Sequence, residues 1–197
     1  MNKINEVFYS LQGEGRFTGK PAVFVRYSGC NLECDFCDTR HQSGKMISDE
    51  ELIALVCQYP SSHVVFTGGE PTLFLKSSIL KSLRESGKFI QVETNGTLRL
   101  DDEILHLIDW ITCSPKNGNL PEIQRIDELK IVFDFEHPDF VENLDNLKAD
   151  GGEYYLQPCD RGDSVFNRIN TDKCISYIKE HPKWKLSLQT HKMLGFR

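Results

Sequence analysis

The chain has 197 residues, of which 39% are hydrophobic and 26% charged, which is typical of a globular protein, and we expect one domain spanning residues 1–197. A formal net charge of −6 without any Lys/Arg run argues against duplex nucleic acid as a partner and favours a small molecule. Apolar runs too short for a bilayer, and a start without a signal peptide's apolar stretch, predict a cytoplasmic protein with no membrane partner.

Short apolar runs rich in β-branched and aromatic residues alternate along the chain with segments of helical periodicity. In chain order, we predict strands at 22–27, 63–67, 89–93, 110–113, 129–135, 153–157 and 185–189. Helices are predicted at 48–59, 73–85, 101–108, 138–147 and 164–181, with Ser48 and Asp101 as caps of the first and third. This alternation predicts an α/β fold.

Several of these strands are apolar without strict alternation, as expected for a parallel sheet that helices cover. A complete eight-unit barrel typically needs about 250 residues, so we predict a partial (incomplete) TIM-like βα barrel. Ligands of such folds bind at the carboxyl ends of the strands. Each motif described below falls at one of those ends.

The seven cysteines divide into a cluster and scattered positions. A disulfide framework is not expected in a reducing compartment, and the count is odd. We interpret Cys57 and Cys174, which lie in amphipathic helical patterns, as small core residues. Cys30, Cys34 and Cys37 instead form a C-x3-C-x2-C motif directly after the strand at 22–27.

Three thiolates in this spacing suit a [4Fe–4S] cluster and leave one iron open to a substrate or cofactor. A structural zinc site is the alternative, but it requires a fourth ligand, from His41 or a distant cysteine. Thr67-Gly68-Gly69-Glu70-Pro71 ends the next predicted strand, where glycines permit close backbone approach and a carboxylate can meet an ammonium.

Together, the cysteine motif, Phe36 before its third cysteine and the Gly-Gly-Glu-Pro turn resemble the radical S-adenosylmethionine superfamily. The resemblance implies a [4Fe–4S] cluster on Cys30, Cys34 and Cys37 whose open iron binds S-adenosylmethionine. The reduced cluster would cleave this cofactor to a 5′-deoxyadenosyl radical, so that the cofactor carries the chemistry and the protein directs it.

Further blocks along nearly the whole chain resemble the 7-carboxy-7-deazaguanine synthase family. They are Leu-Gln-Gly-Glu-Gly at 11–15, Arg26, Cys-Asp-Thr at 37–39, Glu-Thr-Asn-Gly at 93–96, Ser-Pro-Lys at 114–116, Leu-Gln-Pro at 156–158 and Gln-Thr-His-Lys at 189–192. The departures are the loop at 40–42 and a short connection at 120–127. The resemblance implies a lyase-type ring contraction of 6-carboxy-5,6,7,8-tetrahydropterin to 7-carboxy-7-deazaguanine, with loss of ammonia, in queuosine and 7-deazapurine biosynthesis.

The resemblance also implies roles for individual residues. S-adenosylmethionine is expected at Gly68, Gly69, Glu70, Glu93, Ser114, Pro115, Lys116 and Gln157; substrate is expected at Leu11, Gln12, Gly13, Glu14, Arg26, Thr67, His191 and the main chain of Arg197. Glu93 is a candidate either for the ribose hydroxyls of the cofactor or for the substrate. Thr39 would bind Mg²⁺, which prefers oxygen ligands. We interpret Asn95-Gly96 as a turn and assign no acid–base pair.

These roles make chemical sense. The Gln12 amide both donates and accepts, as the edge of a pterin requires, and the Arg26 guanidinium can bind a carboxylate through two hydrogen bonds, although an ordinary ion pair is its alternative. The resemblance further suggests a homodimer and a flavodoxin or ferredoxin as reductant. A glycyl-radical enzyme activase, another small radical enzyme, and a non-catalytic iron–sulfur or zinc module are the alternatives.

Overall fold

The computed structural model describes residues 1–37, 39 and 42–197; His41, a candidate zinc ligand, lies outside the described residues. The strands are β1 (Asn2–Leu11), β2 (Pro21–Tyr27), β3 (Lys45–Ile47), β4 (His63–Gly68), β5 (Phe89–Thr94), β6 (Trp110–Cys113), β7 (Glu128–Phe133), β8 (Glu153–Pro158) and β9 (Lys185–Leu186). The helices are α1 (Asp49–Cys57), α2 (Ser77–Glu85), α3 (Asp102–Leu107), α4 (Asp139–Glu142), α5 (Ser164–Glu180) and α6 (Thr190–Leu194), with 3-10 turns η1 (Gly15–Phe17) and η2 (Pro71–Leu73).

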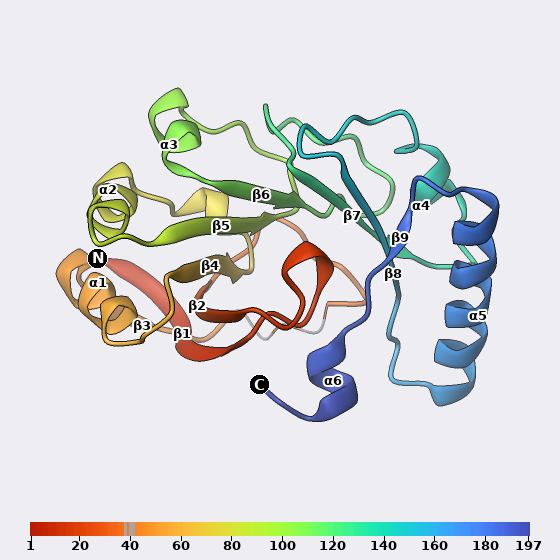
Figure 1. Ribbon diagram of the computed structural model, residues 1–197, viewed down its shortest axis with the longest axis horizontal. Coiled ribbons are helices and arrows are strands. Elements are labelled where there is room, and N and C mark those ends of the chain that lie inside the picture. Colours follow the sequence, from red (N-terminus) through yellow and green to blue (C-terminus); the bar gives the residue numbers. More distant parts are fainter. Residues whose placement is uncertain (38, 40–41) are drawn as a thin grey trace.

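Within the described residues the strands form one sheet in the order β3-β1-β2-β4-β5-β6-β7-β8-β9. In this spatial order, every pair of neighbours from β2 and β4 to β8 and β9 is parallel. β1 runs antiparallel to both of its neighbours, β2 and β3. The sheet curves without closing, and the longer helices lie on its outer side (Figure 1). This is the predicted partial TIM-like barrel.

Alternation along the parallel strands separates an apolar outer face from a polar inner face. In β5, for example, Ile90 and Val92 belong to the main hydrophobic core, whereas Glu93 lines the inner cavity. β7 repeats the pattern, with Leu129 and Ile131 in the core and Lys130 facing inward. The packed helices thus stabilise the outside of the sheet, and the inside is left to charged and hydrogen-bonding groups.

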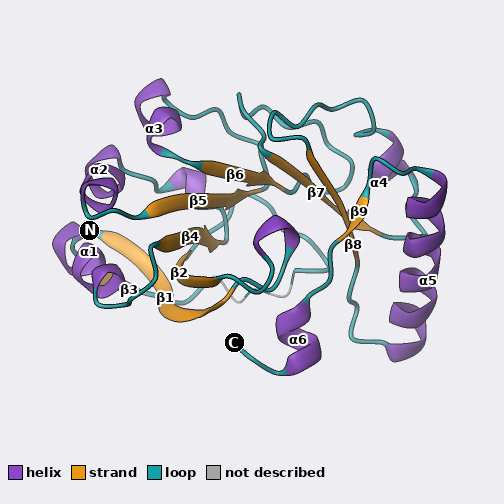
Figure 2. Cartoon of the chain, in the orientation of Figure 1, coloured by secondary structure: helices purple, strands orange, loops and turns teal. Residues whose placement is uncertain are grey.

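Every predicted strand and helix has a counterpart in the structure (Figure 2), and the strand predicted at 110–113 matches β6. The helix predicted at 73–85 instead consists of η2 followed by α2, and that at 138–147 is shortened to α4. The strand predicted at 185–189 ends at Leu186, before α6. β1 and β3, which pair antiparallel at one edge, were not predicted.

The predicted caps and core cysteines are confirmed only in part. The Ser48 hydroxyl accepts a hydrogen bond from the backbone N–H of Glu51 at 3.1 Å, as predicted, whereas the Asp101 side chain makes no capping bond to α3. Cys174 is fully buried, as expected, but the interpretation of Cys57 as a core residue was wrong. Cys57 is the last residue of α1 and faces outward, because Leu52 and Val56 already supply the buried side of this short helix.

The C-terminal segment crosses from β9 back to the start of the chain. The backbone N–H and the hydroxyl of Thr190 both donate to the carbonyl of Gly13, each at 3.0 Å, and α6 lies beside the N-terminal strands (Figure 1). This segment bridges the open side of the barrel.

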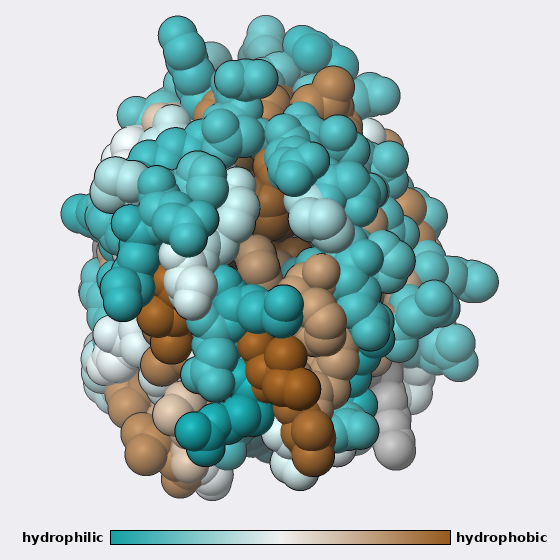
Figure 3. All heavy atoms as spheres, turned by 90° about the vertical axis from the view of Figure 1, so that its right-hand side faces the viewer, coloured by the Kyte–Doolittle hydropathy of each residue, from teal (hydrophilic) through white to brown (hydrophobic). Residues whose placement is uncertain are grey.

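The face seen in Figure 3, on the side of α5, is mostly hydrophilic with separate apolar patches, and exposed apolar side chains of α5 include Val165 and Ile169. No helix among the described residues is long and apolar enough to cross a membrane.

Candidate active site

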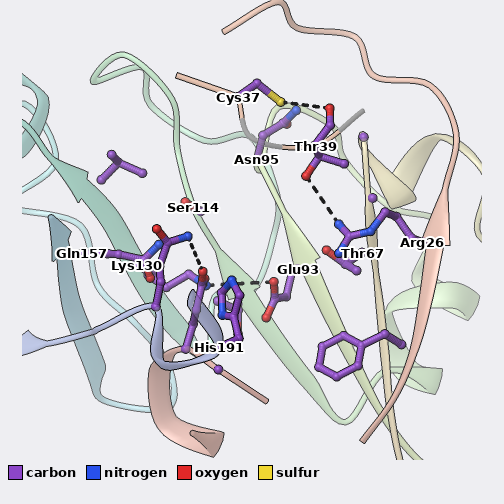
Figure 4. Close-up of a pocket in the computed structure, with 18 of the residues that line it drawn as sticks. Arg26, Cys37, Thr39, Thr67, Glu93, Asn95, Ser114, Lys130, Gln157 and His191 are labelled. Carbon is purple, nitrogen blue, oxygen red and sulfur yellow. Dashed lines mark hydrogen bonds and ion pairs between the residues drawn. The ribbon is translucent and has the colours of Figure 1, made fainter. Parts of the chain in front are cut away.

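A cavity of about 640 Å³ opens at the carboxyl ends of the parallel strands. Its lining includes the following residues that the sequence singled out: Leu11, Gln12, Gly13, Glu14, Arg26, Cys30, Cys34, Cys37, Thr39, Thr67, Gly68, Gly69, Glu93, Ser114, Lys116, Gln157, His191 and Arg197. Figure 4 shows Arg26 and Thr39 on one side of the cavity and Ser114, Lys130 and Gln157 on the other. The fold therefore brings the motifs from both ends of the chain into one chamber.

The cysteine loop rests against the end of β4. The backbone N–H of Glu70 donates to the carbonyl of Gly29 at 2.9 Å, and that of Gly69 donates to the carbonyl of Tyr27 at 3.2 Å. A Cβ atom at Gly69 would lie 1.9 Å from the Gly29 oxygen, so only glycine fits there. At Gly68, φ is +130° and a Cβ would meet the backbone of Tyr27 at 2.3 Å. These glycines permit the contact that positions the loop before Cys30.

The three cysteines of this loop are free thiols that line the cavity. Among the described residues, no three His, Cys, Asp or Glu side chains converge closely enough to hold a single metal ion. In a cubane each thiolate binds a different iron, so separated sulfurs around a common space fit a cluster. The backbone N–H of Leu32 already donates to the Cys30 sulfur at 3.4 Å, an interaction that would also stabilise a thiolate.

Lys116 supplies positive charge beside the cysteine loop. Burial raises the pKa of the Cys34 thiol, and the charge of Lys116 opposes that rise. The pKa of Lys116 is itself lowered, first by burial and then by the nearby Lys130 ammonium. Its Nζ donates to the Ser114 hydroxyl at 2.8 Å, so the Ser-Pro-Lys segment presents a hydroxyl and an ammonium to the cavity.

Two residues expected at the cofactor do not line the cavity, namely Glu70 and Pro115. The Glu70 side chain is fully buried and accepts hydrogen bonds from the backbone N–H and hydroxyl of Thr72, the hydroxyl of Thr94 and the backbone N–H of Asn95, at 2.6–3.0 Å. In this structure the carboxylate is therefore directed to donors of the protein and away from the cavity. Glu70 instead joins the turn after β4 to the end of β5. Pro115 is buried, whereas its neighbours Ser114 and Lys116 line the cavity.

A group of carboxylates surrounds Lys130 on the cavity floor. The Lys130 Nζ lies 2.5 Å from a Glu14 oxygen and 4.0 Å from a Glu93 oxygen. Burial would raise the pKa of Glu14, but the Lys130 charge and the hydrogen bonds from Lys130 and Gln189 outweigh it and lower that pKa to about 2. Gln12, nearly fully buried, donates from its amide to Glu93 at 2.8 Å, and its amide oxygen accepts from the backbone N–H of Gly13 at 2.8 Å.

Arg26 faces the cavity from β2, where the β1–β2 register places it opposite Glu6. Its Nε donates to Glu6 at 2.9 Å, and another guanidinium nitrogen lies 3.5 Å from the Thr39 hydroxyl (Figure 4). Glu6 is also paired with the side chain of Arg197. The ion pair considered as an alternative for Arg26 is thus present, while the guanidinium still lines the cavity.

The C-terminal tail reaches the site, as the sequence led us to expect. His191 lies over Gly13 so closely that a Cβ there would come within 2.3 Å of its Nδ1. The main-chain oxygen of Arg197 accepts from the Ser10 hydroxyl. At the opposite wall, the Gln157 amide oxygen accepts from the Ser187 hydroxyl at 3.0 Å.

Sequence reasoning missed several residues of the cavity, among them Glu6, Lys130 and Asn95. Asn95, interpreted as part of a turn, donates to the side chain of Asn31 at 3.0 Å and so ties the cysteine loop to β5. The sequence feature that could have identified Lys130 as a cavity residue is its position, because a lysine within an otherwise apolar strand of a parallel sheet faces the interior of the barrel.

Comparisons with known proteins agree with this geometry. The family model of the radical SAM superfamily matches residues 24–153. A 7-carboxy-7-deazaguanine synthase from Bacteroides thetaiotaomicron is 46% identical over 197 residues, covering 100% of both chains. Another from Haemophilus influenzae is 37% identical, covering 98% of this chain and 92% of that protein. The crystal structure of QueE from Escherichia coli has a TM-score of 0.75 and 31% identity, covering 96% of this chain and 94% of that one. The chain therefore belongs to the radical SAM superfamily and, within it, to the family of 7-carboxy-7-deazaguanine synthases.

Proposed function

We propose that this chain converts 6-carboxy-5,6,7,8-tetrahydropterin to 7-carboxy-7-deazaguanine and ammonia, as a lyase-type radical SAM enzyme of queuosine and 7-deazapurine biosynthesis. Family membership supports this function. The observation that carries it is the single cavity in which the cysteine loop faces a charged floor formed by Glu14, Glu93 and Lys130. Substrate and products contain the same atoms, so the net reaction needs no external oxidant.

The cofactors would be held by the wall around the cysteine loop. Cys30, Cys34 and Cys37 would bind the [4Fe–4S] cluster, and Gly68 and Gly69, which line the cavity beside this loop, would meet the methionine end of S-adenosylmethionine. Ser114, Lys116 and Gln157 line the adjoining wall and offer hydrogen bonds to the rest of that molecule. When bound, the cluster and S-adenosylmethionine supply the radical chemistry that removes and returns a hydrogen atom of the substrate.

The substrate would occupy the remaining half of the cavity. The Arg26 guanidinium can bind its carboxylate, because Glu6 engages Nε and thereby fixes the orientation of the group. The carboxylates of Glu14 and Glu93 can receive the N–H groups of the pyrimidine ring, with Gln12 and Gly13 lining the cavity beside them. Leu11, Thr67, His191 and the main chain of Arg197 complete this half and restrict the access of water.

Further parts of the proposal rest on family resemblance. We propose that Thr39 contributes its hydroxyl to a Mg²⁺ site shared with the substrate carboxylate, which the ion would polarise. We also propose that residues 1–197 form one domain, that the enzyme is a cytoplasmic homodimer, and that a flavodoxin or ferredoxin reduces the cluster.

Ammonia release tests the proposal. Reduced, reconstituted protein receives the pterin, Mg²⁺ and S-adenosylmethionine well below the pterin concentration. We expect several equivalents of ammonia per S-adenosylmethionine, because the cofactor is regenerated in each cycle. Arg26→Lys should raise KM for the pterin more than it lowers kcat, since a lysine cannot form the paired hydrogen bonds. Consumption of S-adenosylmethionine without pterin-dependent ammonia would favour an activase or another radical enzyme and overturn the substrate assignment.

A further inference from the structure

Lys130 stands at the centre of the cavity floor and is one of the most buried charges in the described structure. Only 7% of its side chain is exposed, compared with 15% for Glu14 and 21% for Glu93. Figure 4 shows Lys130 and Glu93 directed into the same part of the cavity. Placing an ammonium at such depth is unfavourable unless anionic partners compensate, so the charges here depend on one another.

Glu14 and Glu93 are each also held by a neutral side-chain amide. Gln189 donates to Glu14 at 2.9 Å, and Gln12 donates to Glu93 at 2.8 Å. These two amides fix the carboxylates from the sides, while the ammonium between them supplies the compensating charge. The result is a pair of oriented acceptors that line the cavity.

We propose that Lys130 is a positioning residue that keeps Glu14 ionised and holds Glu14 and Glu93 in place, so that they accept hydrogen bonds from the N–H groups of the substrate's pyrimidine ring. This inference rests on the proposed function and adds to it a residue that does not itself react. The chemical reason is one of matching: an ionised carboxylate presents only acceptors, whereas a protonated one carries an O–H that opposes the donors of the ligand. Lys130 would thus control recognition through the protonation state of Glu14.

The other charged groups around Glu14 define what removal of Lys130 would do. Glu93 and Glu128 add negative charge, Lys116 adds positive charge beyond Lys130, and His191 approaches from α6. Burial already raises the pKa of Glu128 to about 6, with the Lys130 charge opposing the rise. Without the Lys130 ammonium, only the Gln189 hydrogen bond and the His191 charge still oppose the effect of burial on Glu14, so the pKa of Glu14 rises.

The experiment measures binding of 6-carboxypterin, the oxidised form of the substrate, which keeps its pyrimidine ring and carboxylate. Its fluorescence gives Kd anaerobically between about pH 5 and about pH 8 for the reconstituted wild type, Lys130→Met and Lys130→Arg. We expect the Lys130→Met Kd to rise about tenfold for each pH unit below the raised Glu14 pKa, relative to wild type. Lys130→Arg, which keeps the charge, should follow the wild-type profile.

Lys185→Met is the matched control, because Lys185 pairs with Glu153 at 2.6 Å outside the cavity. It should leave the profile unchanged. A Lys130→Met profile parallel to that of the wild type would overturn the inference. If Lys130→Met does not fold, Glu14→Gln mimics the protonated carboxylate and should bind weakly at every pH; wild-type affinity in that variant would also overturn it. Failure of the wild type to bind 6-carboxypterin would instead count against the proposed function.

Discussion

The contact between Gly69 and the backbone before Cys30 makes a quantitative prediction about the cysteine loop. In Gly69→Ala the new methyl group would lie 1.9 Å from the Gly29 oxygen and 3.0 Å from the Cys30 nitrogen. Both are backbone atoms, so no side chain can rotate away to make room. The loop must separate from the end of β4, which lengthens the 2.9 Å hydrogen bond from Glu70 to Gly29.

Two terms set the size of the effect. Forcing an extra methyl group into a packed position costs about 1–3 kcal/mol, and weakening one buried hydrogen bond adds about 1 kcal/mol. We therefore expect the free energy of unfolding of the apo protein to fall by about 2–4 kcal/mol. With a urea slope of about 2 kcal/mol/M, the midpoint moves down by about 1–2 M.

Urea denaturation of the apo protein, together with iron content after anaerobic reconstitution and desalting, would measure both consequences. Changes beside metal ligands typically cost about 10–100-fold in affinity, so less iron should be retained. Gly87→Ala is the control, because its φ is +76° but a Cβ there meets nothing within 4 Å, leaving only the backbone cost of about 1–2 kcal/mol. A Gly69→Ala protein with normal iron content and a smaller loss than Gly87→Ala would refute the reasoning.

Three other predictions follow from buried groups. The Glu70 carboxylate accepts four hydrogen bonds, and Glu70→Gln replaces one of its oxygens with a donor. Urea denaturation of the apo variant should therefore show a loss of stability of about 2–3 kcal/mol. An unchanged midpoint would contradict the structural role given to this carboxylate. Burial lowers the pKa of His63 to about 4, so neutral His63 contributes stability above its unfolded pKa of about 6.5, and about 3 kcal/mol of it is lost as the pH falls toward 4. His63→Leu should lack this loss, so the difference in unfolding free energy between wild type and variant should change over this pH range. Parallel stability curves would exclude it. Cys174→Ser would bury a hydroxyl at an apolar site, so it should lower the thermal midpoint and cost about 1–3 kcal/mol of stability. Cys57 is exposed, so the stability of Cys57→Ser should stay within about 0.5 kcal/mol of wild type. Equal effects of the two substitutions would contradict the burial assigned to these cysteines.

Much of the barrel and site could be predicted because a parallel sheet imposes simple rules. Strands covered by helices are apolar runs, and β4, β5 and β6 were recognisable for that reason. Polar motifs directly after such strands must meet at one edge of the sheet. The rule placed Cys30, Thr67 and Ser114 in one cavity although the chain separates them widely.

The direction of individual side chains could not be predicted in the same way. Glu70 follows a strand, as a ligand-binding residue would, but the turn at Pro71 carries its carboxylate toward the donors of Thr94 and Asn95. Its role depends on hydrogen-bond partners more than twenty residues away, which no local pattern reveals.

Pairings across the N-terminal strands were also inaccessible. Glu6 meets Arg26 only because β1 and β2 pair antiparallel in a particular register, which includes an irregularity between Ile4 and Glu6. The first half of β1 is mostly polar, unlike the apolar parallel strands, and Glu6 reads as a surface residue in isolation. The partner that orients Arg26 therefore emerges only from the three-dimensional structure.

Identification of the product tests the central claim most directly. Reduced, reconstituted protein with S-adenosylmethionine, Mg²⁺ and 6-carboxy-5,6,7,8-tetrahydropterin should form 7-carboxy-7-deazaguanine, recognised by chromatography and mass against an authentic standard. Replacement of Cys30, Cys34 and Cys37 by alanine should abolish this product, because no cluster would be held at the cavity. Cleavage of S-adenosylmethionine by the wild type while the pterin remains unchanged would contradict the account.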